Sequence, residues 1–385
     1  MTIQEPGRAC QDPVRAARPQ DERTAHAIEV QTPSRAYQVR VGWGLIDQVG
    51  PLTREVLPKA GRAHVISETN VAPLYADAVA ASLREAGLEP TLQVFEAGEA
   101  SKSVATLSDL LEGLAAAELS RDDLVVALGG GVAGDIGGLA AALYLRGIPV
   151  VQVPTSLLAM VDSSVGGKTA IDLAAGKNLA GAFFQPSLVL ADLDCLDTLS
   201  PRQFTDSCGE VIKCGVIADA DLFRDLEAAP LGLPGTEPER LAATVARCVQ
   251  IKRDVVQQDE REGGIRQILN FGHTIGHAIE AANHFELGHG SSVAAGMCAV
   301  ARASAARGWC AQELADRICS VVAAQGLPTD TSVDHEELLS YAVHDKKRHG
   351  SSVNLVVPEA LGRVRVQRVS FQELRDLIDL GCGVS

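Results

Sequence analysis

A cluster of histidines carries the strongest chemical signal in the sequence. Of the nine histidines, His273, His277, His284 and His289 fall within 17 residues. His273 and His277 stand one helical turn apart, a spacing that can place two imidazoles on one metal ion, although any single histidine could equally belong to the core. Glu210, on another expected helix, is a candidate carboxylate ligand. Together these residues predict a three-ligand site with an open position, as in catalytic zinc sites.

A glycine-rich segment follows an expected strand at residues 123–128. Gly129, Gly131 and Gly134 form the pattern G-x-G-x-x-G at the start of an expected helix. Such glycines let the backbone approach a pyrophosphate, and the helix N-terminus offers free N–H groups. The acidic residue that dinucleotide sites place after the next strand is missing, because that strand ends Val153-Pro154-Thr155. We expect phosphate or dinucleotide binding, with a purely structural turn as the alternative.

Cations recur around both motifs. Lys168 and Lys177 flank small residues that follow Asp162, and Lys213 shares a helix face with Glu210 at i, i+3. Each cation alone could be an ordinary surface residue. Beside a metal site and a phosphate loop, they predict a ligand with more than one negative charge. The remaining cations of this group are Lys252, Arg266, Lys346 and Lys347.

The pattern of apolar residues changes along the chain. In the first half, β-rich runs alternate with helical patterns, which is typical of βαβ units around a parallel sheet. After the Ser-Pro turn at residue 200, apolar residues recur at helical spacing and indicate a mainly α-helical domain. We predict an α/β fold with a disordered tail at 1–27, a parallel-sheet domain at 28–199 and a helical domain at 200–385. The expected strands are 37–41, 63–67, 123–128 and 148–153, and the expected helices are 71–85, 103–118, 240–256 and 292–306.

Composition excludes several classes of protein. The formal net charge of −15 argues against binding to nucleic acid or to an anionic membrane. No apolar run approaches the length of a membrane-spanning helix, and the first 27 residues contain no apolar signal-peptide core. The nine cysteines form no CxxC pair and do not suggest a disulfide framework. We therefore expect a cytoplasmic protein.

Read in order, the motifs resemble those of 3-dehydroquinate synthase, a family of the sugar phosphate cyclase superfamily. The similarity extends from about residue 36 to 366. The resemblance implies an NAD-binding α/β domain, a helical metal-binding domain, an active site in the cleft between them, and a homodimer. The segments that carry it are GGGVAGDIGG, LRGIPVVQVPTSLLAMVDSSVGGKTAID, GKNLAGAFFQP, GEVIKCGVI, RQILNFGHTIGHAIE, HGSSVAAGM and DKK.

The resemblance also assigns residues to the site. It implies that Glu210, His273 and His289 hold zinc or cobalt. It also implies that His277 contacts the substrate phosphate and is not a metal ligand. It implies that Arg146 reaches the phosphate bound by the neighbouring subunit. The other positions matching catalytic or substrate-binding residues are Asp162, Lys168, Asn178, Lys213, Lys252, Arg266, Asn270 and Lys346. The positions matching NAD contacts are Glu99, Lys102, Gly131, Val132, Ala133, Gly134, Asp135, Thr155, Ser156, Lys168, Lys177 and Thr198.

The implied reaction converts 3-deoxy-D-arabino-heptulosonate 7-phosphate into 3-dehydroquinate and phosphate, a step of the shikimate pathway to aromatic amino acids. NAD is oxidant and then reductant around phosphate elimination, before ring opening and aldol closure, so the enzyme would be a lyase. Lys213, His277 and Asn270 are expected to position the substrate and stabilise enolates. Glu68, Ala97 and Ser291 depart from the family pattern, and the first two bear on the adenosine-ribose contacts.

Four alternatives remain. Cyclases that make 2-deoxy-scyllo-inosose or valiolone-type products use substrates without a carboxylate, so the carboxylate clamp of Lys252 and Arg266 disfavours them. An amino-dehydroquinate synthase would keep this clamp. Iron-type alcohol dehydrogenases share the architecture but resemble these segments less. A catalytically silent scaffold would be expected to lose a ligand or a lysine, and all are present.

Overall fold

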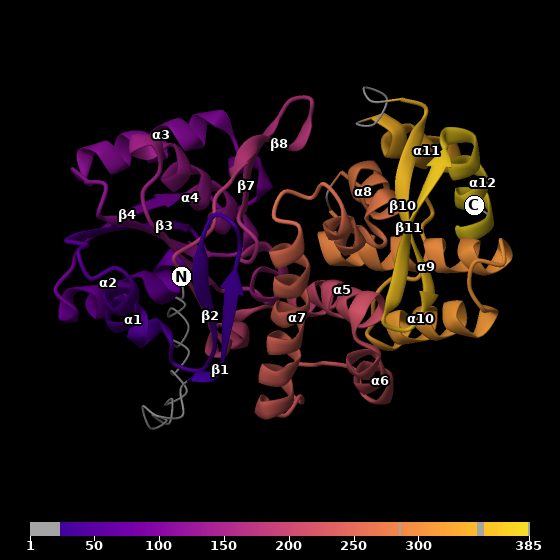
Figure 1. Cartoon of the computed structure of the whole chain (residues 1–385), viewed down its shortest axis with the longest axis horizontal. Helices are drawn as coiled ribbons and strands as arrows, with labels where there is room; N and C mark the ends of the chain where they lie inside the picture. Colours follow the sequence, from indigo (N-terminus) through magenta and orange to yellow (C-terminus); the bar gives the residue numbers. More distant parts are fainter. Residues whose placement is uncertain (1–23, 285, 345–349, 384–385) are drawn as a thin grey trace, which may run out of the picture.

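The computed structural model describes residues 24–284, 286–344 and 350–383, and Figure 1 shows two lobes that meet near helix α7 (Pro238–Gln258). The first lobe is built on a seven-stranded sheet with the order β1-β2-β9-β6-β5-β3-β4. Neighbouring strands are parallel except for the antiparallel pair β1–β2. The strands are β1 (Thr24–Gln31), β2 (Ala36–Gly42), β3 (Arg62–Glu68), β4 (Glu89–Phe95), β5 (Leu124–Gly129), β6 (Val150–Pro154) and β9 (Leu188–Asp192).

The first strand corrects the expected extent of the N-terminal tail. β1 begins at Thr24, so residues 24–27 belong to the sheet and not to a tail. Ile28 and Val30 are buried against the core while Glu29 and Gln31 face solvent, the alternation of an edge strand with one covered face. The rest of the expected tail, residues 1–23, lies outside the described residues.

Helices cover both faces of the sheet because its central strands are apolar on both sides. Val65 of β3 packs in one hydrophobic core with α1 (Val49–Val56) and α2 (Ala72–Glu85). The next residue, Ile66, points to the opposite face and packs in a second core with α3 (Val104–Ala116) and α4 (Gly131–Leu143). The expected parallel α/β domain is therefore present.

The segment around Asp162 and Lys168 combines a short helical turn with a β-hairpin. Residues Ala159–Ser163 form a short π-helical turn after β6. The chain then forms an antiparallel hairpin of β7 (Lys168–Leu173) and β8 (Gly176–Phe183), which projects from the first lobe toward the second in Figure 1. Lys168 is thus the first residue of β7, and Lys177 is the second residue of β8.

The second lobe is mainly helical, and its first helix is well capped. Ser200 and Gln203 form a reciprocal capping box and Pro201 occupies the first turn of α5, as the Ser-Pro signal predicts. A hairpin of β10 (Ser352–Ala360) and β11 (Arg363–Ser370) was not predicted. The helices are α5 (Pro201–Ala218), α6 (Ala220–Ala228), α7, α8 (His273–Ala282), α9 (His289–Ala306), α10 (Gln312–Ala324), α11 (His335–His344) and α12 (Phe371–Gly381).

Helix α9 lies at the centre of this lobe and packs against α5, α8, α10 and α12. Its residues are mostly Ala, Gly and Ser, which let neighbouring backbones come close. Among the described residues, no helix combines the length and apolar character needed to cross a membrane. The cytoplasmic location stays a prediction.

Candidate active site

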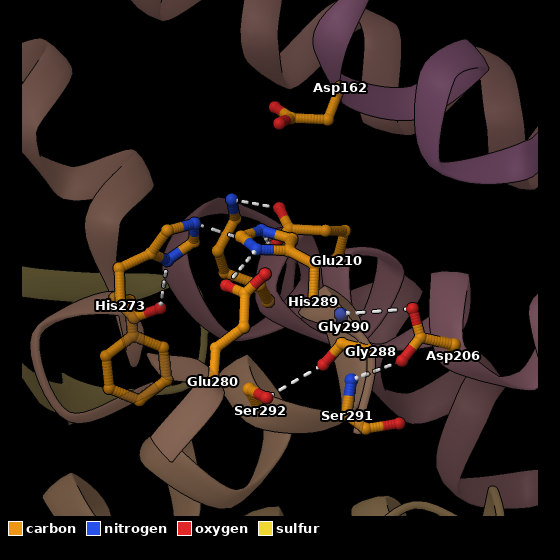
Figure 2. Close-up of polar contacts among 12 residues, drawn as sticks. Asp162, Asp206, Glu210, His273, Glu280, Gly288, His289, Gly290, Ser291 and Ser292 are labelled. Carbon is orange, nitrogen blue, oxygen red and sulfur yellow. Dashed lines mark hydrogen bonds and ion pairs between the residues drawn. The ribbon is translucent and has the colours of Figure 1, made fainter. Parts of the chain in front are cut away.

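Three residues from three helices of the second lobe meet in one cluster. Oε1 of Glu210 on α5 lies 3.5 Å from Nε2 of His273 on α8 and 3.7 Å from Nε2 of His289 on α9 (Figure 2). This oxygen is buried and has no hydrogen-bond partner, which is costly for a carboxylate unless a cation is bound. Nδ1 of His273 lies 3.1 Å from the carbonyl oxygen of Phe271, so a proton there leaves the Nε2 lone pair facing Glu210. The donor set fits a divalent metal ion.

Electrostatics keep His273 in the neutral form that a metal requires. Burial, together with the positive charge of Lys213, holds the pKa of His273 well below its usual value. The second oxygen of Glu210 accepts a hydrogen bond from Lys213, one turn later on the same helix face. Although burial alone would lower the pKa of Lys213, the charges of Glu210 and Asp162 raise it. Lys213 is therefore a buried ammonium beside the proposed metal ligands.

His277, which the spacing from His273 pointed to, also lies in this cluster. Ligand atoms of His273, His277 and His289 all lie within 4.8 Å of one another, and the ring centroids of His273 and His277 are 5.1 Å apart. His277 is exposed whereas the other two are largely covered. An exposed imidazole at the edge of the cluster suits contact with a bound ligand.

Close backbone packing brings Glu210 to His289. A Cβ atom on Gly209 would lie 2.3 Å from the carbonyl oxygen of Gly290, so only glycine allows α5 and α9 to approach this closely. Asp206, one turn before Glu210, accepts hydrogen bonds from the backbone N–H groups of Gly290 (3.2 Å) and Ser291 (2.8 Å) at the start of α9 (Figure 2). Asp206 carries no signal in the sequence, because its partners lie 84 and 85 residues away.

Two of the expected anion-binding cations are buried in the same region. Nζ of Lys252 lies 2.5 Å from both Oδ1 and the carbonyl oxygen of Asp162. Arg266 donates to the carbonyl oxygens of Glu260 (2.5 Å) and Gly166 (3.0 Å), while its Nε has no partner. Burial lowers the pKa of both cations, and the carboxylate of Asp162 opposes this effect at Lys252.

A carboxylate that sequence analysis did not select bridges two expected site residues. Glu262 Oε2 lies 2.6 Å from Nζ of Lys168, and its Oε1 accepts a hydrogen bond of 2.9 Å from Asn270. Glu262 has a positive φ of 61° in the Gly-rich loop after α7. That unusual backbone angle is not visible in the sequence, and no spacing singles out this glutamate from the acidic residues around it.

The glycine-rich turn lies at the N-terminus of α4, whose N-cap residue Gly130 supplies no side-chain hydrogen bond. Gly129 has a φ of 151°, and a Cβ on it would lie 2.7 Å from that of Ala133, so this glycine is required structurally. Glu68 at the end of β3 approaches the same turn. Glu68 is thus an acidic residue beside the turn, on the neighbouring strand β3 of the sheet.

Several expected NAD contacts gather beside this turn. Nζ of Lys102 lies 2.9 Å from Asp135 Oδ2, 2.5 Å from Asn178 Oδ1 and 3.6 Å from Glu99 Oε1. Asn178, expected at the substrate, thus contacts the residues expected at the nucleotide. Lys177 lies 3.4 Å from Glu99.

The remaining expected residues are more dispersed. Thr155 and Ser156 follow β6, and Thr198 is hydrogen-bonded to the hydroxyl of Tyr75 (2.8 Å). Arg146 follows α4 in a kinked turn with a φ of 68°. Lys346 lies outside the described residues.

Comparisons with known proteins give consistent matches. Two family models, described as 3-dehydroquinate synthase N-terminal and C-terminal, match residues 92–206 and 207–348. A 3-dehydroquinate synthase of Citrifermentans bemidjiense is 43% identical over 94% of this chain and 99% of its own length. One from Symbiobacterium thermophilum is 46% identical over 86% of this chain and 93% of its own length.

Solved structures share the fold. A 2-deoxy-scyllo-inosose synthase complexed with carbaglucose-6-phosphate, NAD⁺ and Co²⁺ has a TM-score of 0.84 at 25% identity and covers 92% of this chain and 100% of its own. A 2-epi-5-epi-valiolone synthase from Streptomyces hygroscopicus, with NAD⁺ and Zn²⁺ bound, has a TM-score of 0.81 at 28% identity and covers 89% and 95%.

Proposed function

Because this chain belongs to the 3-dehydroquinate synthase family, we propose that it converts 3-deoxy-D-arabino-heptulosonate 7-phosphate into 3-dehydroquinate and inorganic phosphate. NAD and a divalent metal, zinc or cobalt, are the proposed cofactors, as in the two structurally similar cyclases. When bound, NAD⁺ would accept and return a hydride, and the metal would polarise a substrate oxygen.

The observation that carries this proposal is the orphaned oxygen of Glu210. A buried carboxylate oxygen that faces two imidazole nitrogens at 3.5 and 3.7 Å matches the donor set of a catalytic divalent metal. We propose Glu210, His273 and His289 as the ligands. His277 is left on the exposed side of the cluster, where it can donate to the substrate phosphate.

The buried cations would explain how an acidic protein holds a substrate with two anionic groups, a carboxylate and a phosphate. Lys252 and Arg266 are 6% and 1% exposed, and both lie on the Asp162 side of the site. We propose that they bind the substrate carboxylate, since ion pairs with little solvent around them are strong and directional. Lys213, whose raised pKa keeps it protonated, would donate to an enolate oxygen.

The proposed nucleotide site uses the glycine-rich turn. The free N–H groups at the start of α4 would bind the pyrophosphate, and Glu68 would accept hydrogen bonds from a ribose. The other polar side chains that would line this site are those of Lys102, Asp135 and Lys177.

We further propose a homodimer formed through the end of α4 and the hairpin β7–β8. Large apolar side chains are 39–50% exposed there, at Leu143, Leu145, Leu173, Leu179 and Phe183. Arg146 lies beside Leu145 and could reach the phosphate bound by the other subunit, as the family resemblance implies.

A cytoplasmic location remains part of the proposal. Every cysteine among the described residues is a free thiol, which agrees with a reducing compartment.

Phosphate release by the purified protein, loaded with NAD⁺ and Zn²⁺ or Co²⁺, tests the proposal. The heptulosonate phosphate, glucose 6-phosphate and sedoheptulose 7-phosphate would be offered separately. We expect release with the heptulosonate alone and no net accumulation of NADH, since the hydride is returned. Release only with a sugar phosphate that lacks a carboxylate would instead assign the chain to the alternative cyclases, and would mean that Lys252 and Arg266 do not bind a carboxylate.

A further inference from the structure

We propose that Glu280 is a positioning residue that orients His289 toward the metal and, through Lys177, couples metal binding to occupancy of the dinucleotide site. The inference rests on the proposed function for the identity of the two sites. Neither Glu280 nor any link between the two sites was part of the sequence-based assignments.

Glu280 is a buried carboxylate that uses both of its oxygens. It lies on α8, two turns after His273, and is 6% exposed. Oε2 lies 3.2 Å from Nδ1 of His289, and Oε1 lies 3.0 Å from Nζ of Lys177 (Figure 2 shows the first contact). Its two partners come from different lobes, because Lys177 belongs to β8 and His289 begins α9.

The contact with His289 fixes which ring nitrogen is free for a metal. With the proton on Nδ1 directed at Glu280, the lone pair of Nε2 faces Oε1 of Glu210, 3.7 Å away. A carboxylate behind a metal-bound histidine fixes the ring orientation and increases its basicity, and losing it costs about 10–100-fold in metal affinity. Glu280 is not itself a ligand in this geometry, because it contacts the nitrogen that faces away from Glu210.

The contact with Lys177 extends the arrangement to the nucleotide side. Lys177 lies between two carboxylates, Glu280 at 3.0 Å and Glu99 at 3.4 Å. Glu99 also lies 3.6 Å from Lys102, which contacts Asp135 at the end of the first turn of α4. Lys177 lies on Glu280 at 3.0 Å in the structure, and contacts added by a dinucleotide on α4 would restrain this pair further and hold Glu280 against His289.

The coupling has a defined sign. If dinucleotide binding orders Lys177 on Glu280, less freedom remains to be lost when the metal binds, so each ligand should strengthen the binding of the other by the same factor. We expect NAD⁺ to increase Zn²⁺ affinity about fivefold or more, the lower end of ordinary coupling between sites.

The test measures Zn²⁺ affinity by competition with a chromophoric chelator, without substrate and therefore without turnover, in the presence and absence of saturating NAD⁺. Glu280→Gln keeps the side-chain volume but removes the charge, and should weaken Zn²⁺ binding about 10–100-fold. Lys177→Met should abolish the effect of NAD⁺ on Zn²⁺ affinity, at NAD⁺ concentrations that a separate titration shows to saturate this variant.

A matched control removes a carboxylate from another histidine. Nδ1 of His335 lies 2.8 Å from Asp379 on the outer helices α11 and α12, and Asp379→Asn should change neither Zn²⁺ affinity nor its response to NAD⁺. Wild-type Zn²⁺ affinity in Glu280→Gln would overturn the positioning role. A normal NAD⁺ effect in Lys177→Met would overturn the coupling, and this variant gives an answer even if Glu280→Gln does not fold. Because no step measures phosphate release, a failure of the proposed reaction would be recognised separately.

Discussion

Lys252 of α7 donates to both the carboxylate and the backbone carbonyl of Asp162, at 2.5 Å each, and so ties the helical lobe to the turn that follows β6. Lys252 is 6% exposed, and the Asp162 carboxylate lies near Lys213 as well. Burial alone would raise the pKa of Asp162, but the charges of Lys252 and Lys213 lower it. The pair therefore joins the two lobes where the substrate carboxylate is proposed to bind.

Breaking this pair should have different effects on stability and on substrate binding. Asp162→Asn should lower the free energy of unfolding by about 3 kcal/mol, since it leaves the buried ammonium of Lys252 without its carboxylate. Lys252→Met should lower it by less, because the Asp162 side chain is 30% exposed and also lies near Lys213. The double variant should lose less than the sum of the two, because no charge is then unpaired. Denaturant unfolding measures the loss of stability, and KM for the heptulosonate phosphate measures the loss of substrate affinity. The assignment would be contradicted if the stability losses of the two single variants added up in the double variant. It would also be contradicted if KM stayed at the wild-type value in the variants that lack Lys252.

Arg266 should matter mainly for substrate affinity. Arg266→Ala is expected to raise KM for the heptulosonate phosphate about 30-fold or more, because a buried substrate carboxylate would lose its charged partner. Initial rates of phosphate release across substrate concentration measure this. Arg363→Ala is the matched control, since Arg363 on β11 is 70% exposed and should leave KM unchanged. A near-normal KM in Arg266→Ala would mean that this guanidinium only supports the loop carbonyls it contacts.

The close approach of α5 and α9 should not tolerate a methyl group. Gly209→Ala would place Cβ 2.3 Å from the carbonyl oxygen of Gly290, forcing the helices apart at a cost of about 1–3 kcal/mol. The same shift would separate Glu210 from His289 and weaken Zn²⁺ binding. Gly232→Ala, where a Cβ meets nothing within 4 Å, is the control. Thermal unfolding and chelator competition should both change in the first variant and neither in the second.

The junction of α5 and α6 should depend on pH through Asp219. This residue accepts backbone hydrogen bonds at the start of α6 and pairs with Arg247. Partial burial would raise its pKa, but the hydrogen bonds from Arg247 and from the backbone N–H of Leu222 outweigh burial and lower it. Because the folded-state pKa lies below the unfolded-state value, the carboxylate stabilises the fold above about pH 4, and this contribution is lost at lower pH.

Asp219→Asn should therefore lower the free energy of unfolding by about 1–2 kcal/mol at pH 7, and the difference from wild type should shrink as the pH falls below about 4. Urea unfolding of both proteins at several pH values measures this. A difference that stays constant into the acid range would show that the charge of Asp219 contributes nothing.

The sequence was sufficient for features that depend on local pattern. The apolar runs at residues 123–128 and 148–153 form the strands β5 and β6. A strand that is apolar on both faces has to lie inside a sheet that helices cover on both sides. The Ser-Pro signal at residue 200 became a capped helix start, since capping uses residues within one turn. The histidine cluster could be found in the same way, because His273 and His277 share one helix.

Tertiary structure decided which groups actually meet. Glu210 reaches His289 only because Gly209 and Gly290 let two helices, remote in sequence, come into contact. In the sequence, Glu262 and Glu280 look like any other acidic residue of the chain. Folding places Glu262 between Lys168 and Asn270. It places Glu280 between Lys177 and His289. The physical reason is that hydrogen bonds and charge pairs act over a few ångströms in space, whereas sequence patterns report only neighbours along one helix or strand.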